Sequence, residues 1–360
     1  MKKLPLYVGI LFSFFILSGC TNKNSVSQEN KNNSALYSGV QQQTINDYFS
    51  YPKNTRYIYT GQGNEYASYT AYVDYINENR VQLRSNNGGT EMVKVLEKKD
   101  GELIQLLARG ETYFRENFTQ NLSLSSAESK SKGEILLKEP IVKGTTWTLT
   151  DNRKRTISNV EVDVTTPTGN YKAVEVMTED TGGKTLDYYA PNVGLVKMVF
   201  NSNGSEVSSS LSQIEKNVPL IQNVKFYYPN GNDGKLYFTN KKLSFNTNDI
   251  TRQILEKEFK NPPQGNLGKV MGVNAKINSL YLNQDNRVYI DLSQAFVSEM
   301  NAGSGYESMI LQSVVNTVGG YYGVDKVYLT VNGNPYVSGH IEMKRGEDFN
   351  VNLRNSVELK

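Results

Sequence analysis

The chain contains a single histidine, His340, and this limits the catalytic chemistry that the sequence can support. A zinc site built from several imidazoles, or a metallohydrolase motif with two histidines, needs more than one. Ser338 lies two residues earlier and would share a strand face with His340, but no acid partner stands at a defined position. A serine triad is defined by the geometry of three groups, which this pair does not supply. The sequence therefore argues against a zinc amidase and does not indicate a serine hydrolase.

Carboxylates are plentiful, and a pair suited to glycan cleavage could assemble from distant positions, so that alternative stays open. Asp291 comes shortly before Ser293, and we interpret it as a turn or helix-capping acid. The run Asn230-Gly231-Asn232 faintly suggests a calcium loop, but Lys241 stands where such a loop places its glutamate. We expect no catalytic residue, no metal ligand and no bound cofactor.

The one cysteine, Cys20, ends a segment with the layout of an export signal. Lys2 and Lys3 precede an apolar run from Leu4 to Leu17, which is too short to span a bilayer comfortably. Leu17-Ser18-Gly19-Cys20 resembles the lipobox of bacterial lipoproteins; the alternative is an uncleaved short anchor with a chance cysteine. The resemblance implies that the signal at residues 1–20 is cleaved just before its last residue, Cys20, and that lipid, palmitate included, is attached to this cysteine. Two or three acyl chains would hold the chain firmly at the extracytoplasmic face of the cell membrane.

The composition behind Cys20 predicts a tether followed by a folded body without disulfides. Residues 21–43 are dominated by Asn, Ser, Gln and Lys and cannot bury enough surface to fold. A flexible coil of this length holds the body roughly 25 to 30 Å from the lipid. The full chain has 39 basic and 36 acidic side chains, and loss of Lys2 and Lys3 leaves a net charge near +1. This balance gives no reason to expect a nucleic acid partner.

Residues 44–215 read as a domain of successive antiparallel strands. Asn86-Asn87-Gly88-Gly89, Asp100-Gly101 and Gly182-Gly183 supply the positive φ angles that tight hairpins need. Valines at period two alternate with charged residues, which predicts a curved sheet with one buried and one wet face. The expected strands are Arg56–Thr60, Tyr69–Ile76, Arg80–Arg84, Met92–Leu96, Leu103–Leu106, Val160–Val164, Tyr171–Met177, Leu186–Tyr189 and Leu195–Phe200, with Val93, Val95, Val160, Val162, Val164, Val174 and Val176 on the buried face.

The region around Trp147 and the later run from Tyr188 to Val196 resemble bacterial lipoproteins whose sheet wraps as a half-barrel. That resemblance implies an apolar groove on the concave side. The alternative is that these aromatic side chains fill the core.

Residues 218–340 read as a smaller α+β domain, and 341–360 as a C-terminal segment. Strands at Val224–Tyr228 and Lys235–Phe238 flank a turn cluster and predict a hairpin. Asn248 is expected to cap a helix that buries Ile250, Ile254, Leu255 and Phe259. A hairpin at Ile277–Leu282 and Arg287–Leu292 follows. A second helix begins at Ser304, with Gly303 and Gly305 around its cap, and is stopped by Gly319-Gly320; a strand at Lys326–Val331 closes the domain. The fold class is α+β, with two helices packed on a sheet.

This second domain resembles the GerMN domain of bacterial sporulation and spore germination lipoproteins. The resemblance is carried by Val288 to Ser293 with Phe296, by Glu307, Leu311, Val314, Val315 and Thr317, and by Tyr321, Val324, Val327, Leu329, Val331 and Gly333. This chain departs from the family because it has one copy of the domain and because Asn261-Pro262-Pro263 stands where the family usually has Gly-Pro. It implies a non-enzymatic, membrane-anchored role in assembling envelope or sporulation complexes. Two alternatives remain open: carriage of a lipid or other apolar ligand in the β-sheet groove, and binding or cleavage of peptidoglycan.

Overall fold

The computed structural model describes residues 43–120, 122 and 133–359. The lipid-attachment residue Cys20, the signal at 1–20 and the tether at 21–43, apart from Gln43, lie outside the described residues. A four-residue helix, α1 (Ile45–Tyr48), is the first described element.

Twelve strands form one antiparallel sheet, because the chain alternates apolar and polar residues between turns that reverse it. The sheet order is β6-β5-β4-β3-β2-β1-β12-β11-β10-β9-β8-β7. The strands are β1 (Thr55–Gln62), β2 (Tyr69–Ile76), β3 (Arg80–Asn86), β4 (Glu91–Lys99), β5 (Glu102–Arg109), β6 (Glu134–Lys138), β7 (Thr146–Thr148), β8 (Lys154–Thr166), β9 (Gly169–Asp180), β10 (Gly183–Ala190), β11 (Gly194–Ser202) and β12 (Ser205–Lys216). The predicted curved antiparallel sheet is confirmed.

The hairpin turns have the backbone conformation that their residues predict. Gly88 has φ 84°, and Asp100 and Gly101 have φ 50° and 73°. A residue with a β-carbon is strained in this left-handed region, whereas glycine enters it freely and Asp enters it more readily than most residues. Strand pairs β3–β4 and β4–β5 are consequently joined by short turns and run antiparallel.

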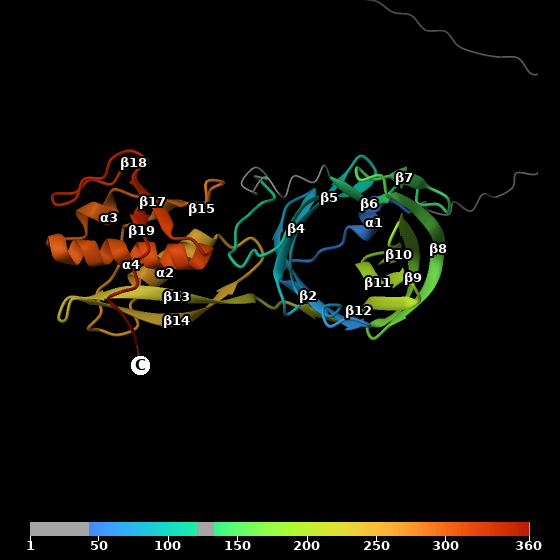
Figure 1. Ribbon diagram of the computed structural model, residues 1–360, viewed down its shortest axis with the longest axis horizontal. Coiled ribbons are helices and arrows are strands. Elements are labelled where there is room, and N and C mark those ends of the chain that lie inside the picture. The colour runs from blue at the N-terminus through green and yellow to red at the C-terminus, as the bar shows by residue number, and fades with distance from the viewer. Residues whose placement is uncertain (1–42, 121, 123–132, 360) are drawn as a thin grey trace, which may run out of the picture. The chain divides into compact units, whose positions relative to one another are not determined.

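The sheet curls until its two edge strands, β6 and β7, come together (Figure 1). They are joined by side chains, without a ladder of backbone hydrogen bonds. Trp147 of β7 donates its indole N–H to the Ile135 carbonyl of β6 at 3.0 Å. Arg155 of β8 donates to the same carbonyl at 2.7 Å and forms an ion pair with Glu134 at 2.5 Å. We call these contacts the seam. The sheet is thus more nearly closed than the predicted half-barrel.

The second part of the chain places two helices between a long hairpin and a small sheet. The hairpin is β13 (Leu220–Asn230) with β14 (Lys235–Phe245), and the helices are α2 (Thr251–Lys260) and α4 (Ser304–Tyr322). The sheet contains β15 (Ile277–Leu282), β16 (Val288–Leu292) and β17 (Lys326–Val331), with β16 and β17 parallel. Short elements complete it: α3 (Ala295–Ser298), β18 (Asn334–Pro335), β19 (Phe349–Asn350), which pairs with β17, and β20 (Ser356–Glu358), which pairs with β14. The predicted α+β class is confirmed.

Two predicted helix boundaries are wrong. Asn248 does not cap α2: its side chain accepts from the Ile76 N–H at 2.8 Å and donates to the Ile76 carbonyl at 3.0 Å, and Ile250 stands at the cap with an exposed side chain. Helix α4 also continues through Gly319-Gly320 to Tyr322, and Gly323, which has φ 71°, stands at its C-cap. A glycine inside a helix costs about 1 kcal/mol and does not by itself end it.

Strand β4 has both faces covered, which the period-two pattern did not predict. Val93 and Val95 are fully buried in a hydrophobic cluster that also contains Phe226 and Phe259 of the second part of the chain. Lys94, between them, therefore points to the inside of the curled sheet and not to bulk solvent.

A buried ion cluster lies on the outer side of β2 and β3. Asp74 accepts from Arg115 at 2.5 Å and from Arg84 at 3.2 Å, and all three side chains are nearly inaccessible to water. Arg115 also donates to the backbone carbonyls of Asn246 and Asp249. The cluster therefore connects the twelve-stranded sheet to the loop before α2.

Candidate ligand site

The curled sheet encloses a cavity of about 370 Å³, which we call the lumen. Its walls come from β1 to β6, β8, β10 and β11. The lining is largely apolar, and its aliphatic side chains are Ala71, Leu83, Met92, Leu96, Leu103, Ala108, Leu136, Val193, Leu195 and Met198. A cavity of this size, apolar with a few polar groups, has the properties of a small-molecule site.

Five tyrosines line the lumen: Tyr51, Tyr57, Tyr59, Tyr69 and Tyr189. The rings of Tyr59 and Tyr69 stack with centroids 4.4 Å apart and an interplanar angle of 12°. The Tyr59 hydroxyl donates to the Leu195 carbonyl at 2.8 Å and so connects β1 to β11, the two strands on either side of β12. Burial raises the pKa of Tyr57 to about 12, so this phenol stays neutral at physiological pH. The rings form rigid, uncharged walls, and the hydroxyls of Tyr57 and Tyr59 already donate to backbone carbonyls.

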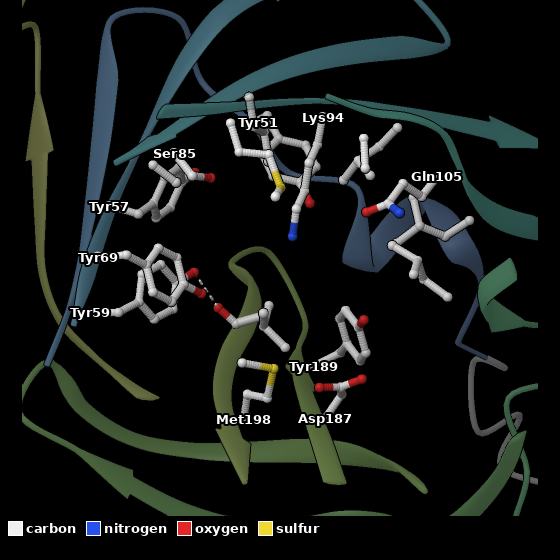
Figure 2. Close-up of a pocket in the computed structure, with 18 of the residues that line it drawn as sticks. Tyr51, Tyr57, Tyr59, Tyr69, Ser85, Lys94, Gln105, Asp187, Tyr189 and Met198 are labelled. Carbon is white, nitrogen blue, oxygen red and sulfur yellow. Dashed lines mark hydrogen bonds between the residues drawn. The ribbon is translucent and has the colours of Figure 1, made fainter. Parts of the chain in front are cut away.

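Two unlike charges face the lumen without a direct partner. Figure 2 shows the Lys94 amine from β4 and the Asp187 carboxylate from β10 reaching toward the same space. No hydrogen bond or ion pair within 4.0 Å joins either charged group to another described residue. Burial lowers the pKa of Lys94, against the attraction of Asp187 and Glu134. Neither charge is therefore compensated at contact distance.

The other two charged side chains of the lumen, Glu134 and Arg155, do form an ion pair. Glu134 binds Arg155, whose remaining guanidinium N–H groups donate to the Ile135 carbonyl and to the Thr178 hydroxyl at 2.9 Å. Because Arg155 also forms part of the seam, this pair holds the wall together and does not offer a free charge to a ligand.

Asp187 should make the stability of the chain depend on pH. Its burial raises its pKa from 3.8 to about 6, while Arg155 and Lys94 act in the opposite direction. At a pH between these two pKa values, Asp187 keeps its proton in the folded chain and has lost it in the unfolded chain. The contribution of Asp187 to the free energy of unfolding therefore falls as the pH rises through this window.

We expect Asp187→Asn to flatten that decline, by at most about 1.4 kcal/mol per pH unit. Urea unfolding followed by circular dichroism at several pH values from about 4 to 7 measures the slope. An unchanged slope in the variant would show that Asp187 titrates alike in the folded and unfolded chains.

The structure does not assemble the residues that the sequence offered for chemistry. The Ser338 hydroxyl accepts from the backbone N–H groups of His340 and Ile341, both at 3.0 Å, and the His340 side chain is exposed. Asp291 is neither a turn acid nor a helix cap: it lies in β16 and accepts from the Thr330 hydroxyl at 2.6 Å and from the Gly333 N–H at 2.7 Å. Among the described residues, no group of three or more His, Cys, Asp or Glu side chains is placed to hold a metal ion.

Sequence reasoning missed Lys94 and Asp187. Both stand among alternating residues, where a charge normally marks the solvent side of a strand. The sequence carries no signal that distinguishes Lys94 from a solvent-facing lysine, because it alternates with valines in either case. No helix in the described part of the chain is long and apolar enough to cross a bilayer.

Comparison with solved structures gives matches of low global similarity. An exported-protein candidate of Bacteroides fragilis with a YmcC-like fold is 16% identical over 47% of this chain and 99% of its own, with a TM-score of 0.30. A lipoprotein candidate of Parabacteroides distasonis is 15% identical over 48% and 100%, with a TM-score of 0.29. The tandem GerMN domains of the sporulation protein GerM from Bacillus subtilis are 20% identical over 37% and 46%, with a TM-score of 0.28. The chain thus spans about half of that GerM structure, and none of the curated proteins compared with the chain matches it.

The family comparison is specific for the second part of the chain. The Germane family model, described as sporulation and spore germination, matches residues 225–337. The match begins in β13 and ends just after β18, and it contains α2, α4 and the parallel pair β16–β17. It therefore covers the segment for which the sequence predicted a GerMN domain. Residues 225–337 are a domain of the Germane family.

Proposed function

We propose that this chain is a non-catalytic lipoprotein held by lipid on Cys20 at the extracytoplasmic face of the cell membrane. In this position it acts as an assembly or interaction component of the envelope in sporulation or spore germination. The Germane domain at residues 225–337 carries the proposal, because it is the one segment matched to a described family. The lipobox-like run that ends at Cys20 supports the anchor. Its partners are the membrane and proteins of an envelope or sporulation complex.

Cys20→Ala is expected to abolish acylation and to release the protein from the membrane fraction. Cys20 is the one cysteine of the chain, so thioether-linked label can report on no other position. Without two or three acyl chains, a body with little net charge has no strong attachment to lipid. Metabolic labelling with an alkyne fatty acid, followed by fractionation, measures both effects.

Ser18→Ala is the matched control, because it keeps a small residue before the cysteine and should leave labelling intact. If the unmodified chain takes up no fatty-acid label, or is recovered in the cytosol, the anchoring proposal is wrong.

The sporulation role has a separate test. Deletion of the gene should lower spore yield or slow germination, and a copy carrying residues 1–360 should restore both. A copy with Cys20→Ala should fail to restore them if anchoring is needed. Normal spore yield and germination in the deletion strain would contradict the sporulation role while leaving the anchor unaffected.

A further inference from the structure

We propose that the lumen binds a small zwitterion with an apolar body, whose carboxylate meets the Lys94 ammonium and whose ammonium meets the Asp187 carboxylate. This site lies in the twelve-stranded sheet, outside the Germane domain, so the proposal goes beyond the function proposed above.

The Lys94 and Asp187 charges face the lumen without partners at contact distance. Lys94 and Asp187 lie on strands separated in the sheet order, and both face one cavity with more than 4.0 Å between their charged atoms. Asp187 is 8% exposed, and its neighbours in the lumen are mostly apolar. Burial of charges without partners is unfavourable, and proteins normally pair them or place them in water. A molecule that fills the space between the two groups would supply both missing partners.

The opposite signs of the two charges favour a zwitterion as the ligand. A simple anion would pair with Lys94 but place a second negative charge near Asp187. A simple cation would pair with Asp187 and repel Lys94. A molecule with both charges offsets, by its attraction to Lys94 and Asp187, the cost of burying each of these charges, and it adds no net charge to the lumen. Glu134 and Arg155 also act on these two groups, but they form an ion pair and so add no net charge to the lumen.

The rest of the lumen suits an apolar ligand body. Most of its other lining residues are aliphatic side chains and tyrosine rings, and the stacked Tyr59–Tyr69 pair gives a flat apolar surface. Apolar groups placed there lose contact with water at about 25 cal/mol per Å² buried. A cavity of about 370 Å³ is at the small end of ligand sites, which suits a molecule of amino-acid size.

A matched series of six-carbon probes tests the proposal. Norleucine and 6-aminohexanoate are zwitterions with the charges adjacent or at opposite ends, whereas hexanoate, hexylamine and hexanol carry one charge or none. Titration calorimetry of the full-length lipoprotein in mild detergent, with detergent alone as the blank, measures each affinity. These short probes enter micelles weakly. We expect one of the zwitterions to bind at least about tenfold more tightly than each of the other three probes, as one charge-assisted contact predicts.

Two substitutions identify the site. Lys94→Met and Asp187→Asn keep side-chain size while removing one charge each, and each should weaken zwitterion binding by about tenfold or more. Lys94→Met should shift the preference toward hexylamine, and Asp187→Asn toward hexanoate. This exchange of preference would not follow from a merely structural effect. The control variants are Lys172→Met and Asp163→Asn, which alter an ion pair on the same sheet with side chains 65% and 81% exposed. They should leave all affinities unchanged.

Circular dichroism of each variant shows whether it is folded. Binding of hexanoate or hexylamine as tight as that of both zwitterions would overturn the proposal. Failure of every probe to bind the folded chain would do so too, as would zwitterion binding that survives both substitutions.

Discussion

Asp74→Ala is expected to lower the free energy of unfolding by about 3–5 kcal/mol, because it leaves two buried guanidinium groups without their shared anion. Arg115 would retain carbonyl partners, and Arg84 would retain Glu91 at 2.9 Å, but no described carboxylate would remain beside Arg115. The Gln82 amide, which also donates to Asp74 at 3.1 Å, would lose that bond. Urea unfolding followed by circular dichroism measures the change.

Asp163→Ala is the matched control, because it removes one partner of an exposed pair, Lys172–Asp163. Pairs of this kind contribute about 0–1 kcal/mol, so the control should unfold almost as the unmodified chain does. Asp74→Asn should lie between the two, since the amide keeps a hydrogen-bond acceptor but loses the charge. A loss below about 1 kcal/mol in Asp74→Ala would show that the guanidinium groups find other partners or water.

A chain that ends at Lys216 is expected to lose the cooperative unfolding of the twelve-stranded sheet, although every strand of that sheet is present. Val93, Val95, Leu107, Phe114 and Phe118 belong to one hydrophobic cluster with side chains of the Germane domain. Truncation exposes these side chains, and each large one loses roughly 1.5–3 kcal/mol of stabilising free energy from burial. The summed loss is comparable with the free energy of unfolding of a whole domain, about 5–15 kcal/mol.

Thermal unfolding and size-exclusion chromatography measure this loss. The control is a chain that begins at Gln43 and continues to Lys360; it keeps every contact of the described residues and should unfold as the longer chain does. A truncated chain that stays monomeric and unfolds cooperatively at the same temperature would show that the sheet is independently stable.

The sequence predicts elements well where local pattern and packing agree. Strand Tyr69–Ile76 and strand Lys326–Val331 have the predicted bounds, because alternation or a β-branched run is followed by a turn. The two hairpins predicted in the second part of the chain also form, as the antiparallel pairs β13–β14 and β15–β16.

Other elements depend on long-range pairing. Strand β12 was not predicted because its first half is rich in serine, which has little tendency to form strands. It forms because β1 and β11 pair with it on both sides and so join the two halves of the sheet. Strands β6 and β7 are short edge strands with little alternation to detect.

The candidate site was the least predictable part. The groove was inferred from Trp147 and from the segment containing Tyr189; Tyr189 does line the lumen, whereas Trp147 lies in the seam. Lys94 and Asp187 could not be assigned to it, because the inside of a curled sheet follows the same period-two pattern as a solvent face. Only the closure of the sheet distinguishes the two.

The seam is the place where the circumference of the curled sheet can change. Elsewhere around its circumference, neighbouring strands are held by backbone ladders. At the seam between β6 and β7, the side chains of Trp147 and Arg155 instead donate hydrogen bonds to the Ile135 carbonyl, and Arg155 also donates to the Glu134 carboxylate. Rotation of these two side chains would release this edge while every ladder bond stays intact, so the circumference of the curled sheet can increase there without the unfolding of a strand.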